Sequence, residues 1–223
     1  MTLNEIAYNL LNLVRAGRSH NDENISIGQI KFNIKHYRAM FIRRDFMRNG
    51  LITRHLEQDA GCLELEQVDA SKCPCSHNTI DCPVYRTKKK LPRTVRFNFK
   101  DAITHVGDVT GLGRIPLIEP YEVQWLPHDK YTAKNPKAYM IEDYVYIYNP
   151  GGMDFINVRG VFEDPEELAA LETCDGTCYD ADSTFPIPAD MIAAITSGLI
   201  NGELKLLIST LVDDENDRQQ DTQ

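Results

Sequence analysis

The spacing of apolar residues changes twice along this chain of 223 residues, and this change most constrains the fold. In the first 50 residues apolar side chains recur every third or fourth position, as in helices. From about Cys62 to Phe162 they alternate with polar ones, as in strands. Helical spacing returns after Asp164. The sequence therefore predicts an α+β fold, with helical N- and C-terminal segments flanking a central antiparallel β module, a small sandwich or open barrel.

Two helices are expected before the β module. Thr2 and Glu5 form a capping box, in which each side chain bonds a free amide of the first helical turn. Ser26 and Gln29 repeat this pattern and open a longer helix that should end near Asn49, with Gly50 as its stop signal. The apolar face expected for this helix is Ile27, Ile30, Ile34, Tyr37 and Phe41.

The β module and the C-terminal segment follow from the same patterns. Strands are predicted at residues 62–66, 94–99, 121–125, 138–141, 144–148 and 155–162, with turns at 142–143 and 149–152. A helix is expected to start after the capping residue Asp164, and a last helix near Pro188. Gly198 and Gly202 would allow another backbone to approach that last helix closely. Its predicted buried stripe is Met191, Ile192, Ile195, Leu199, Leu206 and Leu207.

These elements suggest four segments. Residues 1–60 form an N-terminal helical segment, and 61–163 form the β module. Residues 164–212 form a C-terminal helical segment that packs with the N-terminal helices. Residues 213–223 are acidic, lack an apolar anchor, and are expected to be disordered.

Composition excludes several classes of protein. A formal net charge of −9 argues against a general nucleic-acid binder, whose phosphate contacts need a basic surface. No apolar run approaches the roughly 20 residues that span a bilayer, and Glu5 stands where a signal peptide needs positive charge. We therefore expect cytoplasmic synthesis and no membrane partner. In a reducing cytosol, disulfides are not expected among the six cysteines, Cys62, Cys73, Cys75, Cys82, Cys174 and Cys178.

The cysteine-rich stretch CPCSHNTIDC leaves two readings. Cys73, Cys75, His77 and Cys82 are the donor types of tetrahedral zinc, but they lie in one short loop without the separated pairs of a zinc finger. Cys174 and Cys178 could add a second pair from a polar loop. The spacing favours no metal, although zinc binding stays open.

No catalytic residues are predicted. The six histidines lack the spacing of a metalloprotease helix, and the glycines of residues 107–113 lack the GK[ST] ending of a phosphate loop. No GxSxG nucleophile elbow occurs either. The sequence therefore indicates neither an enzyme nor a cofactor.

One basic surface stands out in an otherwise acidic chain. The expected long helix carries a series of cations, of which we take five as a candidate assembly interface: Lys35, Arg38, Arg43, Arg44 and Arg48. Such a series is often only a solvated helix face. The alternative is a docking surface for an acidic neighbour or a phosphate backbone.

Several stretches resemble a virion structural protein of crAss-like bacteriophages, from Met1 to about Leu206: MTLNEIAYNLLNLVR, IKFNIKHYRAMFIRRDFMRNG, PRTVRFNFKDAIT, PKAYMIEDYVYIYNP, INVRGVFEDPEEL and PADMIAAITSGLINGEL. More narrowly, the chain resembles the head-to-tail connector proteins, also called neck or adaptor proteins. The resemblance implies a homo-oligomeric ring, commonly of twelve subunits, that joins the portal to the tail. It also implies that portal protein and other connector or tail ring proteins are partners, and that genomic DNA passes through the channel without sequence-specific binding. The competing hypothesis is a cytosolic regulatory module that binds zinc or nucleic acid.

Overall fold

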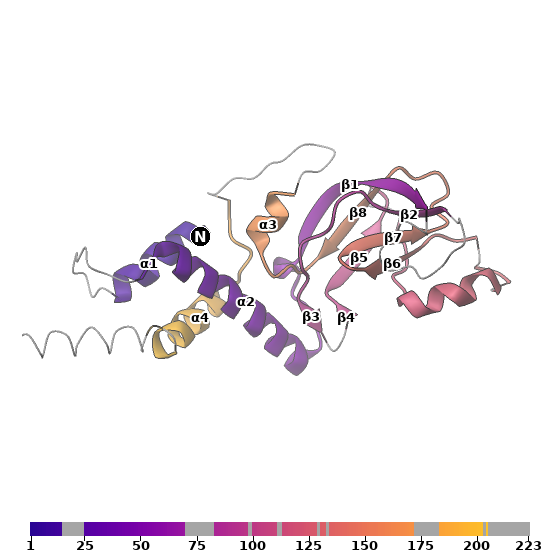
Figure 1. The fold of residues 1–223 in the computed structure, drawn as a ribbon. Coiled ribbons are helices and arrows are strands. Elements are labelled where there is room, and N and C mark those ends of the chain that lie inside the picture. The colour runs from indigo at the N-terminus through magenta and orange to yellow at the C-terminus, as the bar shows by residue number, and fades with distance from the viewer. Residues whose placement is uncertain are drawn as a thin grey trace, which may run out of the picture. The chain divides into compact units, whose positions relative to one another are not determined.

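The computed structural model describes residues 1–14, 25–69, 83–97, 100–110, 113–128, 130–132, 134–171, 183–202 and 204. They belong to two compact units, of which the first comprises Met1–Leu56 and Asp180–Gln223 and the second Glu57–Tyr179. Helices at both ends and an antiparallel sheet between them confirm the predicted α+β class (Figure 1).

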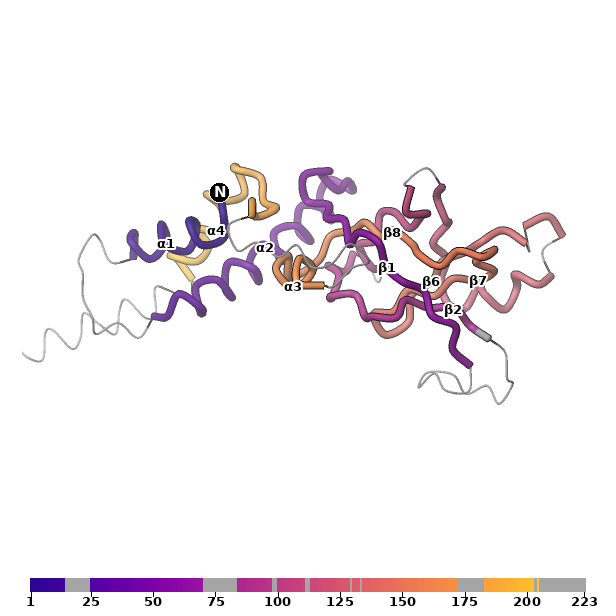
Figure 2. The backbone as a smooth tube through the Cα atoms, turned by 90° about the horizontal axis from the view of Figure 1, so that it is seen from above, coloured from indigo at the N-terminus to yellow at the C-terminus, as the bar shows by residue number. Residues whose placement is uncertain are grey.

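The first unit is helical. Helices α1 (Leu3–Val14), α2 (Ile27–Asn49) and α4 (Ala189–Asn201) lie close together, although α4 is far from the others in sequence (Figure 2). They share one apolar core, in which the predicted α2 face takes part. The fully buried members of that core are Leu3, Ile6, Ala7, Leu10, Leu11, Ile25, Ile30, Ile34, Phe185, Ile195, Leu199 and Leu204.

The predicted helix ends are confirmed. The Thr2 amide donates to Glu5 Oε2 over 2.9 Å, and the Glu5 amide donates to Thr2 Oγ1 over 3.1 Å. At the start of α2, the Gln29 amide donates to Ser26 Oγ over 3.1 Å. Gly50 ends α2 with a φ of 71°, a left-handed conformation that glycine adopts without strain. Local sequence signals therefore fix where these helices begin and end.

Gly198 and Gly202 do allow a close approach to the last helix, but by a side-chain ring and not by the other backbone that the sequence predicts. A Cβ atom built on Gly198 would lie 3.1 Å from Cε1 of Tyr37, and one on Gly202 would lie 2.8 Å from the Tyr37 hydroxyl. The two glycines therefore let the ring of Tyr37 on α2 lie directly against the backbone of α4. A side chain at either position would push the two helices apart.

The second unit contains a six-stranded antiparallel sheet in the order β5-β8-β1-β2-β7-β6, curved into a nearly closed barrel, and a short hairpin of β3 and β4 (Figure 1). The strands are β1 (Gln58–Asp69), β2 (Pro83–Thr87), β3 (Arg96–Phe97), β4 (Lys100–Asp101), β5 (Ile103–Gly107), β6 (Lys137–Ile141), β7 (Tyr144–Tyr148) and β8 (Phe155–Gly160).

Strand β1 joins the two halves of the sheet. Its first half pairs with β8 and its second half with β2. The change of partner follows a bulge between Asp59 and Cys62, where Gly61 has a φ of 69°. Asp59 holds this bulge, because its carboxylate accepts from the Gly61 amide and from Asn157 Nδ2, each over 2.8 Å.

Helix α3 (Pro165–Ala169) differs from the predicted segment boundary. Asp164 caps it as expected and accepts from the Glu166 amide over 2.9 Å. However, α3 belongs to the second unit, whereas the sequence pattern groups it with the C-terminal helices. The physical reason is that Leu168 is buried in the core of the β sheet.

The strand predictions are correct where local turns define the hairpin. Strands β6, β7 and β8 occur as expected, and Glu142 and Asp143 turn with φ values of 50° and 68°. The strand expected at 121–125 is wrong, because these residues belong to a 3-10 helix, η3 (Pro120–His128). Strands β2 and β5 are additions that the pattern does not predict.

The glycine contact gives a first testable prediction. Replacing Gly198→Val should destabilise the first unit by about 1–3 kcal/mol, because the new side chain overlaps the ring of Tyr37. Thermal unfolding of the full chain measures this effect. Gly28→Ala is the matched control, since a Cβ there meets only Ser26 Oγ at 3.9 Å, and it should be neutral or stabilising. Equal melting temperatures for Gly198→Val and the unaltered protein would contradict the close packing.

Candidate functional site

The five predicted interface cations all lie on α2, but one of them is internal. Arg38 has an exposed fraction of 0%. Its Nε donates to the carbonyl oxygen of Pro186 over 2.9 Å, and its guanidinium carbon lies 5.7 Å from the ring centroid of Phe185. Arg38 therefore ties α2 to the segment that precedes α4. We leave it out of the docking surface for this reason.

The remaining cations do not share one side of the helix. Lys35 is half-buried, whereas Arg43, Arg44 and Arg48 are exposed. Successive helix residues are rotated by about 100°, so Arg44 and Arg48 lie within about 40° of each other. Arg43 lies about 100° away from Arg44. The basic series therefore divides into the pair Arg44 and Arg48, the exposed Arg43 on another side of α2, and the half-buried Lys35.

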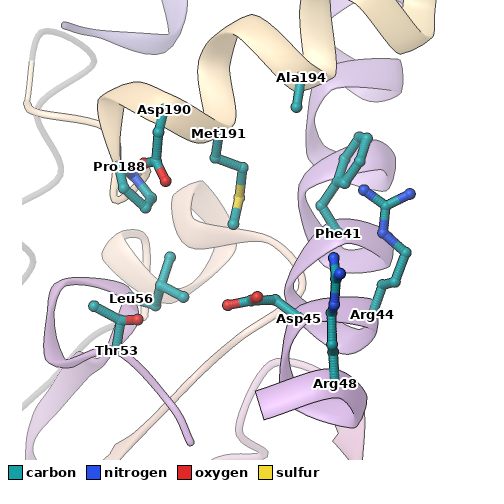
Figure 3. Close-up of a pocket in the computed structure, with 10 residues that line it drawn as sticks. All are labelled: Phe41, Arg44, Asp45, Arg48, Thr53, Leu56, Pro188, Asp190, Met191 and Ala194. Atoms are coloured by element: carbon teal, nitrogen blue, oxygen red, sulfur yellow. The ribbon is translucent and has the colours of Figure 1, made fainter.

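The pair lines a pocket of about 470 Å³ between α2, α4 and the short 3-10 helix η1 (Arg54–Leu56) (Figure 3). Its apolar lining includes Phe41, Leu56 and Met191. The guanidinium carbon of Arg44 lies 4.3 Å from the ring centroid of Phe41, within cation–π range. The charged group of Arg44 is thus held over an aromatic ring, although the residue as a whole is exposed.

Two carboxylates balance the two arginines in this pocket. Asp45 accepts from Asn49 Nδ2 over 2.6 Å, and Asp190 lies in the first turn of α4, where the helix dipole favours an acid. The formal charge of the lining side chains is therefore zero. A bare phosphate backbone is poorly matched to such a pocket. A protein segment that offers both an apolar group and a carboxylate fits better.

The second unit carries an exposed aromatic group that the sequence patterns did not single out. Trp125 of η3 is 64% exposed, and Tyr121 of the same helix is also largely exposed. Tyr131, just beyond η3, is exposed as well. The available signal was Pro127, two residues after the strand expected at 121–125, since proline disfavours strand pairing. Exposed aromatic side chains of this kind are typical of protein interfaces.

The expectation that no disulfide forms is wrong for Cys62. This residue lies buried in β1 and is disulfide-bonded. The other five cysteines, Cys73, Cys75, Cys82, Cys174 and Cys178, lie outside the described residues. The expectation rested on the compartment of synthesis alone, whereas disulfides form and persist in oxidising surroundings.

The zinc hypothesis stays untested. His77 and the three cysteines of its loop lie outside the described residues. Within the described ranges, His, Cys, Asp and Glu form no group of three or more that could hold a metal ion. The described helices also include none with the length and apolar character needed to cross a bilayer.

The internal position of Arg38 gives a second prediction. Replacing Arg38→Ala should destabilise the first unit by about 2–3 kcal/mol, because it leaves the Pro186 carbonyl without its charged donor and removes packing against Phe185. Arg43→Ala is the matched control on the same helix and should change stability by less than about 0.5 kcal/mol. Chemical denaturation of both variants measures the difference. Equal losses would show that Arg38 carries no special structural role.

The disulfide gives a third prediction. Reduction should lower the stability of the second unit by about 2–4 kcal/mol, since the bond limits the freedom of the unfolded chain. Thermal unfolding with and without reductant measures this loss. Cys62→Ala should remove most of the response to reductant, and non-reducing peptide mapping should identify the partner cysteine. A Cys62 thiol that reacts freely with an alkylating reagent in the unfolded, unreduced protein would contradict the bond.

Comparison with known proteins agrees with the resemblance seen in the sequence. None of the curated proteins matches the chain. The family model CrAss ring 2, described as phage tail ring protein 2, matches residues 5–222. The match covers both compact units and includes α2 with its pocket. The chain therefore belongs to the phage tail ring protein 2 family of crAss-like phages, and it is a structural component of the phage tail.

Proposed function

We propose that this protein is a non-catalytic subunit of the head-to-tail connector, in which copies form a ring that joins the portal to the tail. The observation that carries the proposal is the family match over residues 5–222. The ring has about twelve copies, as is common in tailed-phage connectors. Its neighbours are the portal protein and other connector or tail ring proteins.

The distribution of exposed side chains supports an assembly role. A ring of identical copies needs two different surfaces on each copy, because head-to-tail contacts are heterologous. A connector ring needs further surfaces toward the layers above and below. The helical unit offers the α2 cations and the pocket beside them, and the β unit offers Tyr121 and Trp125. Two compact units thus carry separate sets of exposed groups.

The net charge supports a channel through which DNA moves. The chain has a formal charge of −9, and like charges reduce the capture of phosphates. Genomic DNA therefore passes without sequence-specific binding. The exposed cations of α2 serve protein contacts in this proposal.

The proposed assembly surface consists of Arg43, Arg44 and Arg48. These side chains meet acidic groups of a neighbouring copy or of the adjacent ring. Arg44 and Arg48 act together, because they line one pocket with an apolar floor. An arginine that is buried and paired in an interface costs about 2–5 kcal/mol when it is removed, and a rim charge costs far less.

Charge reversal at the pocket gives the fourth prediction. The double variant Arg44→Glu with Arg48→Glu should stay folded but fail to enter particles, because it places two carboxylates where the partner presents acids. Immunoblotting of purified virions for the protein measures incorporation, and thermal unfolding of the purified subunit tests its fold.

A second double variant provides the control. Arg93→Glu with Arg114→Glu changes the net charge by the same amount on exposed residues of the second unit. Particles should contain this control at normal levels. Normal incorporation of the Arg44 and Arg48 variant into infectious particles would mean that these arginines are only solvated.

A further inference from the structure

Helix α2 exposes apolar side chains on the side opposite its buried face. Phe32 is 68% exposed, Met40 is 45% exposed and Met47 is 55% exposed. At about 100° per residue, these three lie within about 80° of one another around the helix, and His36 and Arg43 fall between them. We call these five residues the α2 stripe. The buried side chains Ile30 and Ile34 project from the other side of the helix.

The α2 stripe is long enough to receive another helix. From Phe32 to Met47 it extends about 22 Å, at a rise of 1.5 Å per residue. The ring of Phe32 stacks on that of His36 with centroids 6.5 Å apart and an angle of 8°, so it lies along the helix surface. Aligned apolar groups of this size, interspersed with polar ones, are typical of protein interaction sites. Methionine adds side chains that adapt readily to a partner.

Helix α1 exposes a second face that complements the stripe. Its exposed side chains are Glu5, Tyr8, Asn9, Asn12 and Leu13, which we call the α1 outer face. Tyr8 and Leu13 are its large apolar members. Glu5 is the one charged side chain of α1. Its Oε2 accepts from the Thr2 amide over 2.9 Å, yet Glu5 is exposed and opposite in charge to Arg43 of the stripe. Each face therefore combines two or three apolar anchors with a charge, which is negative on the α1 outer face and positive on the α2 stripe.

The two faces point in opposite directions. The buried residues of α1 and α2, such as Ile6 and Ile34, belong to the same core, so the core lies between the two helices. The α1 outer face and the α2 stripe each lie on the side of their helix that faces away from that core. One copy therefore has complementary surfaces on opposite sides of a single helical layer. Head-to-tail contact between copies requires this arrangement.

We propose that the α1 outer face of one copy packs on the α2 stripe of the next copy and forms the lateral contact of the ring. The inference rests on the proposed function, because only an assembly of copies brings the two faces together. It concerns a different side of α2 from the pocket of Arg44 and Arg48. The occupant is a second copy of this chain, held by Tyr8 and Leu13 against Phe32, Met40 and Met47.

Photo-crosslinking in assembled particles tests the contact directly. Phe32→p-benzoylphenylalanine should give a product of twice the subunit mass, in which peptide mapping joins α2 to residues 5–13 of another copy. The same probe at Asn49, an exposed residue on the other side of α2, should not reach residues 5–13. A Phe32 crosslink to a different virion protein or to residues 205–223, or no crosslinked product, would overturn the proposal.

Substitution of the anchors tests the pairing of the two faces. The triple variant Phe32→Ser, Met40→Ser and Met47→Ser should stay folded and weaken contact between copies at least about tenfold. Tyr8→Ser with Leu13→Ser should have a similar effect. Combining both sets of substitutions should weaken the contact little further, because both sets remove the same contact. Fully additive losses would mean that the two faces bind different partners.

These outcomes are distinguishable from failure of the proposed function. If copies are present in a ring but the Phe32 probe does not reach residues 5–13, the lateral contact is wrong and the connector proposal stands. If virions contain no ring of this protein, the connector proposal itself fails. The number of copies per particle, measured by quantitative mass spectrometry, separates the two cases.

Discussion

The structure of the helical unit depends on one constraint, which is that α2 must bury one side from Ile30 to Ile42. Helices α1 and α4 do not form a core alone, because a short amphipathic helix needs a partner for its apolar face. Ile30 and Ile34 of α2 share the core to which both helices contribute. Gly198 brings α4 against Tyr37, and Arg38 holds the chain that leads into α4. Because its buried side is fixed in this way, the opposite side of α2 has a defined orientation.

Local signals predicted much of the fold. The capping residues Thr2, Ser26 and Asp164 mark helix starts correctly, because each satisfies amides that are next to it in sequence. The hairpin of β6 and β7 was predictable for the same reason, since its turn is two residues long. Strand β2 was not, because its strand character comes from pairing with β1 and β7 and not from its own sequence pattern. The segment around Trp125 shows the opposite error. Its apolar and polar residues alternate as in a strand, but it folds as a 3-10 helix.

The candidate site was predictable in part. The charge pattern identified α2 as the basic surface of an acidic chain. Charge alone, however, does not distinguish the buried Arg38 from the exposed Arg48. Tertiary contact separates them, because Phe185 and Pro186 surround Arg38 from a segment almost 150 residues later in sequence. The exposure of the α2 stripe could not be predicted from the sequence, for a different reason. Apolar residues on both sides of a helix blur the amphipathic pattern, so Met40 and Met47 carry no local sign of exposure.

An exposed apolar stripe on a stable helix is a disadvantage unless it binds a partner, because it promotes nonspecific association. In the proposed ring, contact through such a stripe must be weak enough to leave free copies apart. Five residues with two polar members meet that requirement better than a continuous apolar surface, since His36 and Arg43 interrupt the stripe. Closure of the ring then stabilises the assembly, because each copy makes the lateral contact with both of its neighbours. Both contacts are lost only when the ring opens. Weak lateral contacts and a separate charged pocket toward another partner are therefore compatible on one helix.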